Sequence, residues 1–327
     1  MKVAMAIFAA LIAAANTIAV VDAQAQASYP ASPIRILVAY PPGGFPDTTT
    51  RILGEQLRKH FNQQIIVENR PSAGTIVAGQ AVTRAAPDGY TLLAADSQMW
   101  GIAPNTIKDF PFDPINDFEP VSIFATTANF LVTSATVPVT GNLKDLLDYL
   151  KANPGKLNYG TAGIGSLHHL TMTALRARTG IEANHVPYKG NAQILPALVS
   201  GEVGFAFQSL AALPKFVADG KIRMFAIAAN QRSKVFPDIP TFEEFGIKDM
   251  EFLGTMALLA PKGTPKDIIN KLADAVQAGA QDPEFKKRVN AIGVESPALA
   301  PQDTAAWIKR EAAALTAAAK AANIKPE

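Results

Sequence analysis

The chain carries one local pattern twice: an apolar stretch runs into a glycine-rich loop, and the loop opens a helix. The first copy runs over 34–40 into Pro41-Pro42-Gly43-Gly44, and the second runs over 157–160 into Thr161-Ala162-Gly163-Ile164-Gly165. A helix start has N–H groups without intrahelical partners and a partial positive charge, and glycine lets a ligand approach that backbone closely. We therefore predict that two such ends, one from each half of the chain, hold an anion between two lobes.

The size and charge of the chain limit its class. Its 327 residues predict two domains, and 30 basic against 28 acidic residues give a net charge of +2, which indicates neither a nucleic-acid partner nor a membrane surface. There is no cysteine, so thiol catalysis, cysteine-ligated metals and lipid attachment are excluded. Neither a cofactor nor a metal site is predicted.

The N-terminus has the pattern of a secretion signal. Lys2 supplies a positive charge, 3–15 is apolar, and Ala23-Gln24-Ala25 and Ala25-Gln26-Ala27 both fit a cleavage site. The apolar run is too short to span a bilayer, and no later stretch is long and apolar enough. We expect residues 1–27 to be cleaved and a soluble protein to be exported to a bacterial periplasm.

Two series of strands and helices follow in the same order: strand, glycine loop, helix, strand, helix, strand, helix, strand. The expected strands are 34–40, 64–68, 90–95 and 121–125, then 157–160, 184–187, 203–207 and 223–228. This order predicts an α/β protein with two similar lobes, each built on a mostly parallel sheet flanked by helices.

Two apolar segments are expected to connect the lobes. Residues 130–134 would carry the chain outward and 252–260 would carry it back, so that two crossings make a hinge. Lobe 1 would then comprise 28–126 and 252–327, and lobe 2 would comprise 127–251.

The C-terminal tail is expected to be helical. Thr264-Pro265-Lys266-Asp267 has the pattern of a capping box, and Asp282-Pro283 starts another helix that Gly293 ends. The alanine-rich stretch 302–322 predicts a long surface helix.

Short motifs follow one another along the chain after the signal. They are Pro33-Ile34-Arg35, Pro41-Pro42-Gly43-Gly44 with Asp47, Val67-Glu68-Asn69-Arg70-Pro71, Ala86-Pro87-Asp88-Gly89-Tyr90-Thr91-Leu92-Leu93, Ala152-Asn153-Pro154-Gly155-Lys156-Leu157-Asn158-Tyr159-Gly160, His185-Val186-Pro187-Tyr188-Lys189-Gly190, Pro237-Asp238-Ile239-Pro240-Thr241 and Leu258-Leu259-Ala260-Pro261-Lys262-Gly263-Thr264-Pro265. In this order and spacing they resemble the substrate-binding proteins of tripartite tricarboxylate transporters, the TctC or Bug family. The resemblance implies a two-lobe periplasmic binding fold, type II-like, that closes on a carboxylate and delivers it to a membrane permease.

The first glycine loop is expected to bind one carboxylate of the ligand. Pro42, Gly43, Gly44 and the following helix start would offer backbone donors, although a purely structural turn is the alternative. Asp47 is negative, so we expect it to cap the helix and fix the loop. Phe45 could stack on an aromatic ligand if it faces the crevice, whereas the default for Phe45, and for Trp100, is a surface or core position.

The resemblance implies that the second loop also contacts the ligand carboxylate, through Thr161, Ala162, Gly163, Gly165 and Ser166. Ser166 could cap the helix, donate to the ligand, or do both. His169 matches the usual histidine of the family, and a structural hydrogen bond is the expected role for it and for His168, which should not chelate one metal with it.

Further candidates follow the third strand of each series, where strand ends face the crevice. They are Ser97 and Gln98 in the first series and Gln208 in the second. The family often has an aspartate at the position of Gln208. A neutral glutamine can donate to a second carboxylate, so amino-acid ligands are disfavoured and aliphatic or aromatic carboxylates are expected.

Three readings of function stay open. The leading one is a monomeric periplasmic solute-binding protein without chemistry of its own, which contacts its permease transiently. The second is a secreted enzyme on the same two-lobe fold, for which Ser166 with His169 is the nearby nucleophile–base candidate. The third is a sensor that closes on the same ligand and docks to a receptor.

Overall fold

The computed structural model describes residues 29–72, 75–188, 191–209 and 213–326, so the predicted signal over 1–27 lies outside the described residues. The described strands form one mixed sheet of nine, in the order β2-β1-β3-β9-β4-β7-β5-β6, with β8 also paired to β4. The strands are β1 (Ile34–Val38), β2 (Ile65–Asn69), β3 (Thr91–Asp96), β4 (Phe118–Ser134), β5 (Asn158–Thr161), β6 (Asn184–Pro187), β7 (Phe205–Ser209), β8 (Ile222–Ile227) and β9 (Leu253–Pro261).

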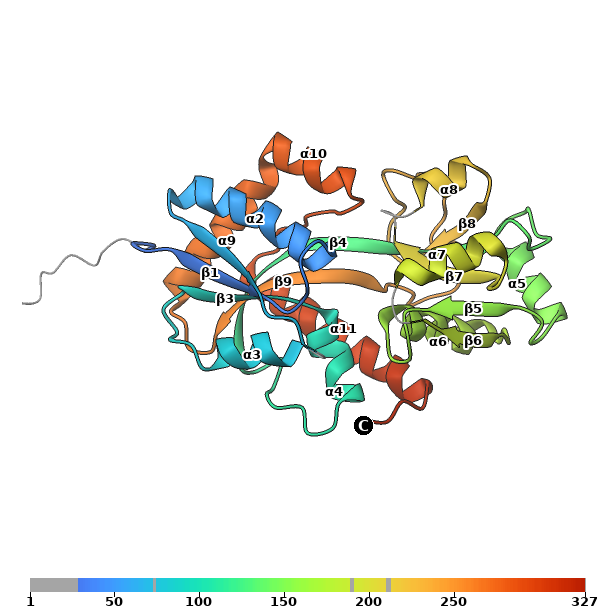
Figure 1. The fold of residues 1–327 in the computed structure, drawn as a ribbon, viewed down its shortest axis with the longest axis horizontal. Helices are drawn as coiled ribbons and strands as arrows, with labels where there is room; N and C mark the ends of the chain where they lie inside the picture. Colours follow the sequence, from blue (N-terminus) through green and yellow to red (C-terminus); the bar gives the residue numbers. More distant parts are fainter. Residues whose placement is uncertain (1–28, 73–74, 189–190, 210–212, 327) are drawn as a thin grey trace, which may run out of the picture.

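Helices pack on both faces of this sheet (Figure 1). They are α2 (Phe45–Phe61), α3 (Ile76–Thr83), the π-helical turn η2 (Gln98–Ile102), α4 (Ala103–Thr106), α5 (Leu143–Ala152), α6 (Leu167–Thr179), α7 (Asn191–Ser200), α8 (Pro214–Ala218), α9 (Lys266–Gln281), α10 (Pro283–Ala291) and α11 (Pro301–Ala321). None of the described helices meets the length and hydropathy needed to cross a membrane.

The repeated order of elements and the α/β class are confirmed. In what we call the first half, β2, β1 and β3 are parallel, and in the second half β6, β5 and β7 are parallel. Each set is followed by antiparallel strands: β9 and then β4 in the first half, β4 and then β8 in the second. In Figure 1 the carboxyl ends of β1 and β5 both point toward the other half, as the glycine loops require.

A single strand, β4, belongs to both halves. Its 17 residues pair with β9 as far as Ala128 and with β7 from Asn129 onward. The strand predicted over 121–125 and the crossing expected over 130–134 are therefore parts of one continuous strand. Two register shifts in its pairing with β9 let the strand continue while the sheet bends.

Side-chain caps explain two of the helix starts. Asn142 accepts from the Lys144 and Asp145 amides and starts α5 with a capping box, and Asp282 likewise accepts from two amides at the start of α10. The capping box predicted over 264–267 is wrong, because the Thr264 hydroxyl donates to the Pro261 carbonyl at 2.8 Å instead. That turn closes before the helix begins, so α9 starts without a side-chain cap.

Helix α11 forms at the surface as its alanine content predicted, but one of its faces is buried against both halves, which the sequence did not indicate. It runs past both halves (Figure 1) and contacts η2, β4 and α6. Ile308 belongs to a hydrophobic cluster of the first half, whereas Leu315, Ala318 and Ala319 belong to the main cluster of the second. Gly101 provides the room, since a Cβ there would lie 2.2 Å from Leu315 Cδ1.

Candidate functional site

The side chain of Asp47 fixes the loop between β1 and α2. Residues 41–44 are exposed, whereas Asp47 is buried. Its carboxylate accepts from the Gly43 amide at 2.9 Å, from Arg51 Nε at 3.0 Å and from Asn69 Nδ2 at 2.7 Å. Burial opposes ionisation, but the bonds from Arg51, Gly43 and Asn69 outweigh it and lower the pKa of Asp47. The charged carboxylate thus ties the loop, the helix and the end of β2 together. The predicted cap is wrong, because Asp47 accepts from the amide of Gly43, which precedes the N-cap, and α2 has no side-chain cap.

These contacts limit which backbone N–H groups of the β1–α2 loop remain available to a ligand. The Gly43 amide already bonds to Asp47, and Pro42 has no N–H. The Gly44 and Phe45 amides have no hydrogen-bond partner in the described part of the chain, and Gly44 is the N-cap position of α2. The Phe45 ring is half-buried, and a Cβ on Gly254 of β9 would lie 3.8 Å from it.

The β5–α6 loop depends on two glycines with positive φ, Gly163 at 114° and Gly165 at 75°. Ser166 is the N-cap of α6, because its Oγ accepts from the His169 amide at 3.3 Å. Thr161 Oγ1 lies 3.3 Å from both the amide and the carbonyl of Gly163. A Cβ on Gly165 would lie 2.9 Å from Thr106 Cγ2, so this loop contacts α4 of the first half.

Two stacked histidines lie under the second loop. The rings of His169 and His185 are 4.4 Å apart and nearly parallel, and His185 also stacks on Tyr159 at 4.9 Å. His169 Nδ1 accepts from the Gly165 amide at 3.1 Å, and His185 Nε2 lies 2.6 Å from Thr161 Oγ1. The expected structural role of His169 is what the structure shows, whereas His185 is absent from the predicted residues.

No local pattern in the sequence singles out His185, because its partners come from another strand. It lies on β6 and is paired with Tyr159 of the neighbouring parallel strand, two residues before the loop begins at Thr161. His168 is also buried, and its Nε2 lies 3.3 Å from Asn129 Oδ1 of β4.

The residues at the ends of the third strands are largely buried. Ser97 is buried and Gln98 is half-buried at the start of η2. Gln208 is 2% exposed, and its Nε2 has no hydrogen-bond partner among the described residues. Asp96 accepts from the Tyr40 hydroxyl at 2.7 Å, and burial raises the pKa of Asp96 to about 6 despite this bond. Unlike Asp96, Gln208 therefore has side-chain N–H donors that bond to no other group in the described part of the chain.

Trp100 lies in the core and not in a crevice. Its Nε1 donates to Glu311 of α11 at 2.8 Å, and the Thr255 hydroxyl donates to the same carboxylate at 2.8 Å. Burial, together with the negative charges of Asp96 and Glu251, raises the pKa of Glu311 to about 7, although the bonds from Thr255 and Trp100 favour ionisation.

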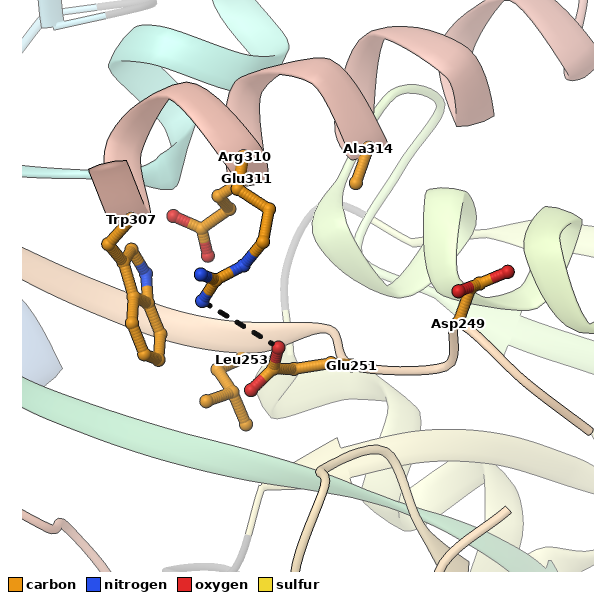
Figure 2. Close-up of a pocket in the computed structure, with 7 residues that line it drawn as sticks. All are labelled: Asp249, Glu251, Leu253, Trp307, Arg310, Glu311 and Ala314. Carbon is orange, nitrogen blue, oxygen red and sulfur yellow. Dashed lines mark ion pairs between the residues drawn. The ribbon is translucent and has the colours of Figure 1, made fainter. Parts of the chain in front are cut away.

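Two cavities lie away from the predicted binding residues, none of which lines either one. The smaller, of about 140 Å³, is lined by Glu311, Trp307, Leu253 and the Glu251–Arg310 ion pair (Figure 2). The larger, of about 530 Å³, includes Thr126, Ala128 and Phe130 of β4 in its lining. Asn129, which alternates with them along the strand, instead contacts α6. Among the described residues, no hydrogen bond joins loop 42–47 to loop 161–169.

Glu311 gives a prediction for the pH dependence of stability. Its pKa is about 7 in the folded protein against an ordinary value of 4.5, so its protonated form stabilises the fold at low pH and this contribution is lost as pH rises through 7. We expect Glu311→Gln to remove about 1–2 kcal/mol of the loss in unfolding free energy that the wild type shows between pH 5 and pH 8. Urea denaturation at both pH values measures this. The exposed control Glu182→Gln should follow the wild type, and an identical pH dependence in all three proteins would contradict the assignment.

Comparison with known proteins identifies the family. Residues 49–324 match the model of the tripartite tricarboxylate transporter family receptor, TctC. A UPF0065 protein of Bordetella pertussis is 37% identical over 82% of both chains. An R. palustris protein solved with adipate has a TM-score of 0.77 and 29% identity over 91% of this chain and all of its own. MatC of Rhodopseudomonas palustris, solved with bound malate, has a TM-score of 0.72 and 28% identity over 89% of this chain and all of its own. The fold is therefore the α/β periplasmic binding protein fold, and the chain belongs to the tripartite tricarboxylate transporter receptor family, TctC.

Proposed function

We propose that this protein is an exported solute-binding protein that holds a small carboxylate between its two halves and delivers it to a membrane permease. The observation that carries the proposal is the pair of helix starts at the ends of β1 and β5, each reached through a glycine loop held by a buried side chain. The Gly44 and Phe45 amides, which have no hydrogen-bond partner in the described part of the chain, suit one carboxylate group. The two R. palustris relatives solved with adipate and with malate support a carboxylate ligand.

A dicarboxylate is the ligand class that we favour. Gln208 is buried at the carboxyl end of β7 and its amide donors are unused, so it suits a second carboxylate at the far end of the ligand. An aromatic carboxylate is the alternative, because Phe45 is the first residue of α2 and its ring could stack on an aromatic ligand. In this proposal Pro42, Ser97, Gln98, Thr161, Ala162, Gly163, Gly165 and Ser166 complete the site.

The contacts of Ser166 and His169 speak against the enzyme reading. Ser166 Oγ accepts from the His169 backbone amide, while the ring Nδ1 of His169 accepts from Gly165. A hydrolase would need the ring to take the proton of the serine hydroxyl. A role as a sensor uses the same site, and the ligand test does not separate it from transport. We propose further that the protein acts as a monomer in the periplasm, without nucleic acid, after cleavage of residues 1–27.

Isothermal titration calorimetry with adipate, malate and phthalate tests the proposal, with adipamide as the uncharged control. We expect at least one diacid to bind and adipamide not to bind, because the amide donors and helix ends select for negative charge. Ligand at about 100 times its Kd should stabilise the fold by about 2.7 kcal/mol. Gln208→Ala should weaken diacid binding about tenfold, the value of one hydrogen bond to a charged group, and leave a monocarboxylate unaffected. Binding of adipamide as tight as that of adipate would overturn the carboxylate assignment.

A further inference from the structure

The two rings under the β5–α6 loop hold it at both ends. His185 Nε2 lies 2.6 Å from the hydroxyl of Thr161, where the loop begins, and that hydroxyl also contacts Gly163. His169 Nδ1 accepts from the amide of Gly165, where the loop ends. The rings stack on one another within 6° of parallel. The two stacked rings therefore restrain the shape of the loop at its beginning and at its end.

The bond to Gly165 depends on the protonation of His169. An amide N–H can donate only to a ring nitrogen that carries no proton, so Nδ1 must be unprotonated and the proton of the neutral ring sits on Nε2. Protonation of Nδ1 would set two donors against each other at 3.1 Å. Gly165 also lies close to Thr106 of α4, so the loop cannot move toward α4 to separate the two donors.

The surroundings of the pair resist positive charge. From α6 the Arg176 guanidinium lies 5.9 Å from the Tyr159 ring, and from β5 Tyr159 stacks on His185. Among the described residues, the cation of Arg176 acts on both histidines, so a proton on either ring would place a second positive charge near the first. Burial, then the charge of Arg176, lowers the pKa of His169. Burial, then the charges of His169 and Arg176, lowers the pKa of His185 to about 4.

We propose that His169 and His185 are positioning residues that keep the β5–α6 loop in its binding conformation, and that the loop keeps this conformation only while Nδ1 of His169 carries no proton. The inference rests on the proposed function of this loop in holding the ligand. Because the pKa of each ring is lowered from the ordinary 6.5, the neutral form of both rings predominates above pH 6.5. As pH falls below this toward about 4, each folded ring resists a proton that the unfolded chain would accept, so stability and loop geometry are lost together.

The first experiment needs no ligand. The ring nitrogens of His169 and the amide of Gly165 are followed by NMR from pH 8 to pH 4.5 in the wild type, in His169→Asn and in His169→Leu. Asparagine keeps an acceptor where Nδ1 stood but does not titrate, and leucine keeps volume without an acceptor. We expect the Gly165 amide signal to move with His169 protonation, below pH 6.5, in the wild type, and to stay constant in His169→Asn. A Gly165 signal that ignores His169 protonation would overturn the proposal.

The second experiment measures adipate binding at pH 7.5 and pH 5. The ratio of the wild-type Kd to that of His169→Asn cancels the titration of adipate itself. We expect the wild type to lose at least fivefold more affinity on acidification than His169→Asn, and His169→Leu to bind at least tenfold more weakly at both pH values. An equal loss of adipate affinity in the wild type and in His169→Asn on going from pH 7.5 to pH 5 would contradict the inference. Tighter binding by the wild type at pH 5 would contradict it as well. Should adipate not bind at all, the ligand assignment is in question, and the NMR experiment still decides the role of the rings.

Discussion

Replacing Asp47 with alanine is expected to lower the free energy of unfolding by about 2–3 kcal/mol and to weaken carboxylate binding at least a hundredfold. The substitution removes a buried carboxylate that three groups contact, the Gly43 amide, Arg51 and Asn69. Buried donors left without partners cost about 1–3 kcal/mol, and the exposed part of Arg51 moderates the loss. Freed from Asp47, the Gly43 amide no longer sets the direction of the neighbouring Gly44 and Phe45 amides.

Urea denaturation and calorimetry with the tightest diacid of the panel measure the two effects. Asp47→Asn is the matched control, because it keeps the volume and one acceptor for Gly43 while it removes the charge that faces Arg51. We expect it to lose less stability than Asp47→Ala and to bind with intermediate affinity. Wild-type affinity in Asp47→Ala would show that the loop does not need this anchor. Tighter binding would show that the Asp47 charge repels the ligand.

Leu315→Ala is expected to cost about 2–5 kcal/mol of unfolding free energy, the usual range for a fully buried leucine. Leu315 is 1% exposed and packs against Gly101 of η2, within the main hydrophobic cluster of the second half. The cavity would form where α11 passes from one half to the other. Because Gly101 has no side chain to fill the gap, little relaxation is expected and the cost should lie in the upper part of the range.

Thermal and urea unfolding of Leu315→Ala and of Ala313→Ser test this expectation. Ala313 is exposed on the same helix, so its substitution should change the free energy of unfolding by less than about 0.5 kcal/mol. If Leu315→Ala also unfolded within that margin, α11 would be dispensable for the joint between the halves, contrary to its contacts in the structure.

Local patterns in the sequence predicted the elements well. The two series of strands and helices and the start of α10 follow from periodicity, glycine loops and a capping residue, which act over a few positions. Features set by distant partners were missed or predicted wrongly. The continuity of β4 depends on β7 and β9, and the burial of α11 depends on Gly101 and on clusters of both halves.

The candidate site shows the same division. The glycine loops, Ser166 as a cap and Asp47 as the anchor of its loop could be predicted because each acts on residues within a few positions. The partner of Asp47 on β2, Asn69, and the ring of His185 on β6 come from other strands, so no local pattern reveals them. The role of these residues in binding a ligand stays a prediction.

The unbroken course of β4 through both halves bears on how such a molecule could shut. The strand changes partner from β9 to β7 between the successive residues Ala128 and Asn129, so no unpaired residue separates the two halves along it, and closure would have to twist a paired ribbon. Part of the binding free energy would be stored as elastic strain in the twisted strand and recovered when the protein opens. The grip on a captured solute would then be weaker than its contacts alone provide, and escape correspondingly faster.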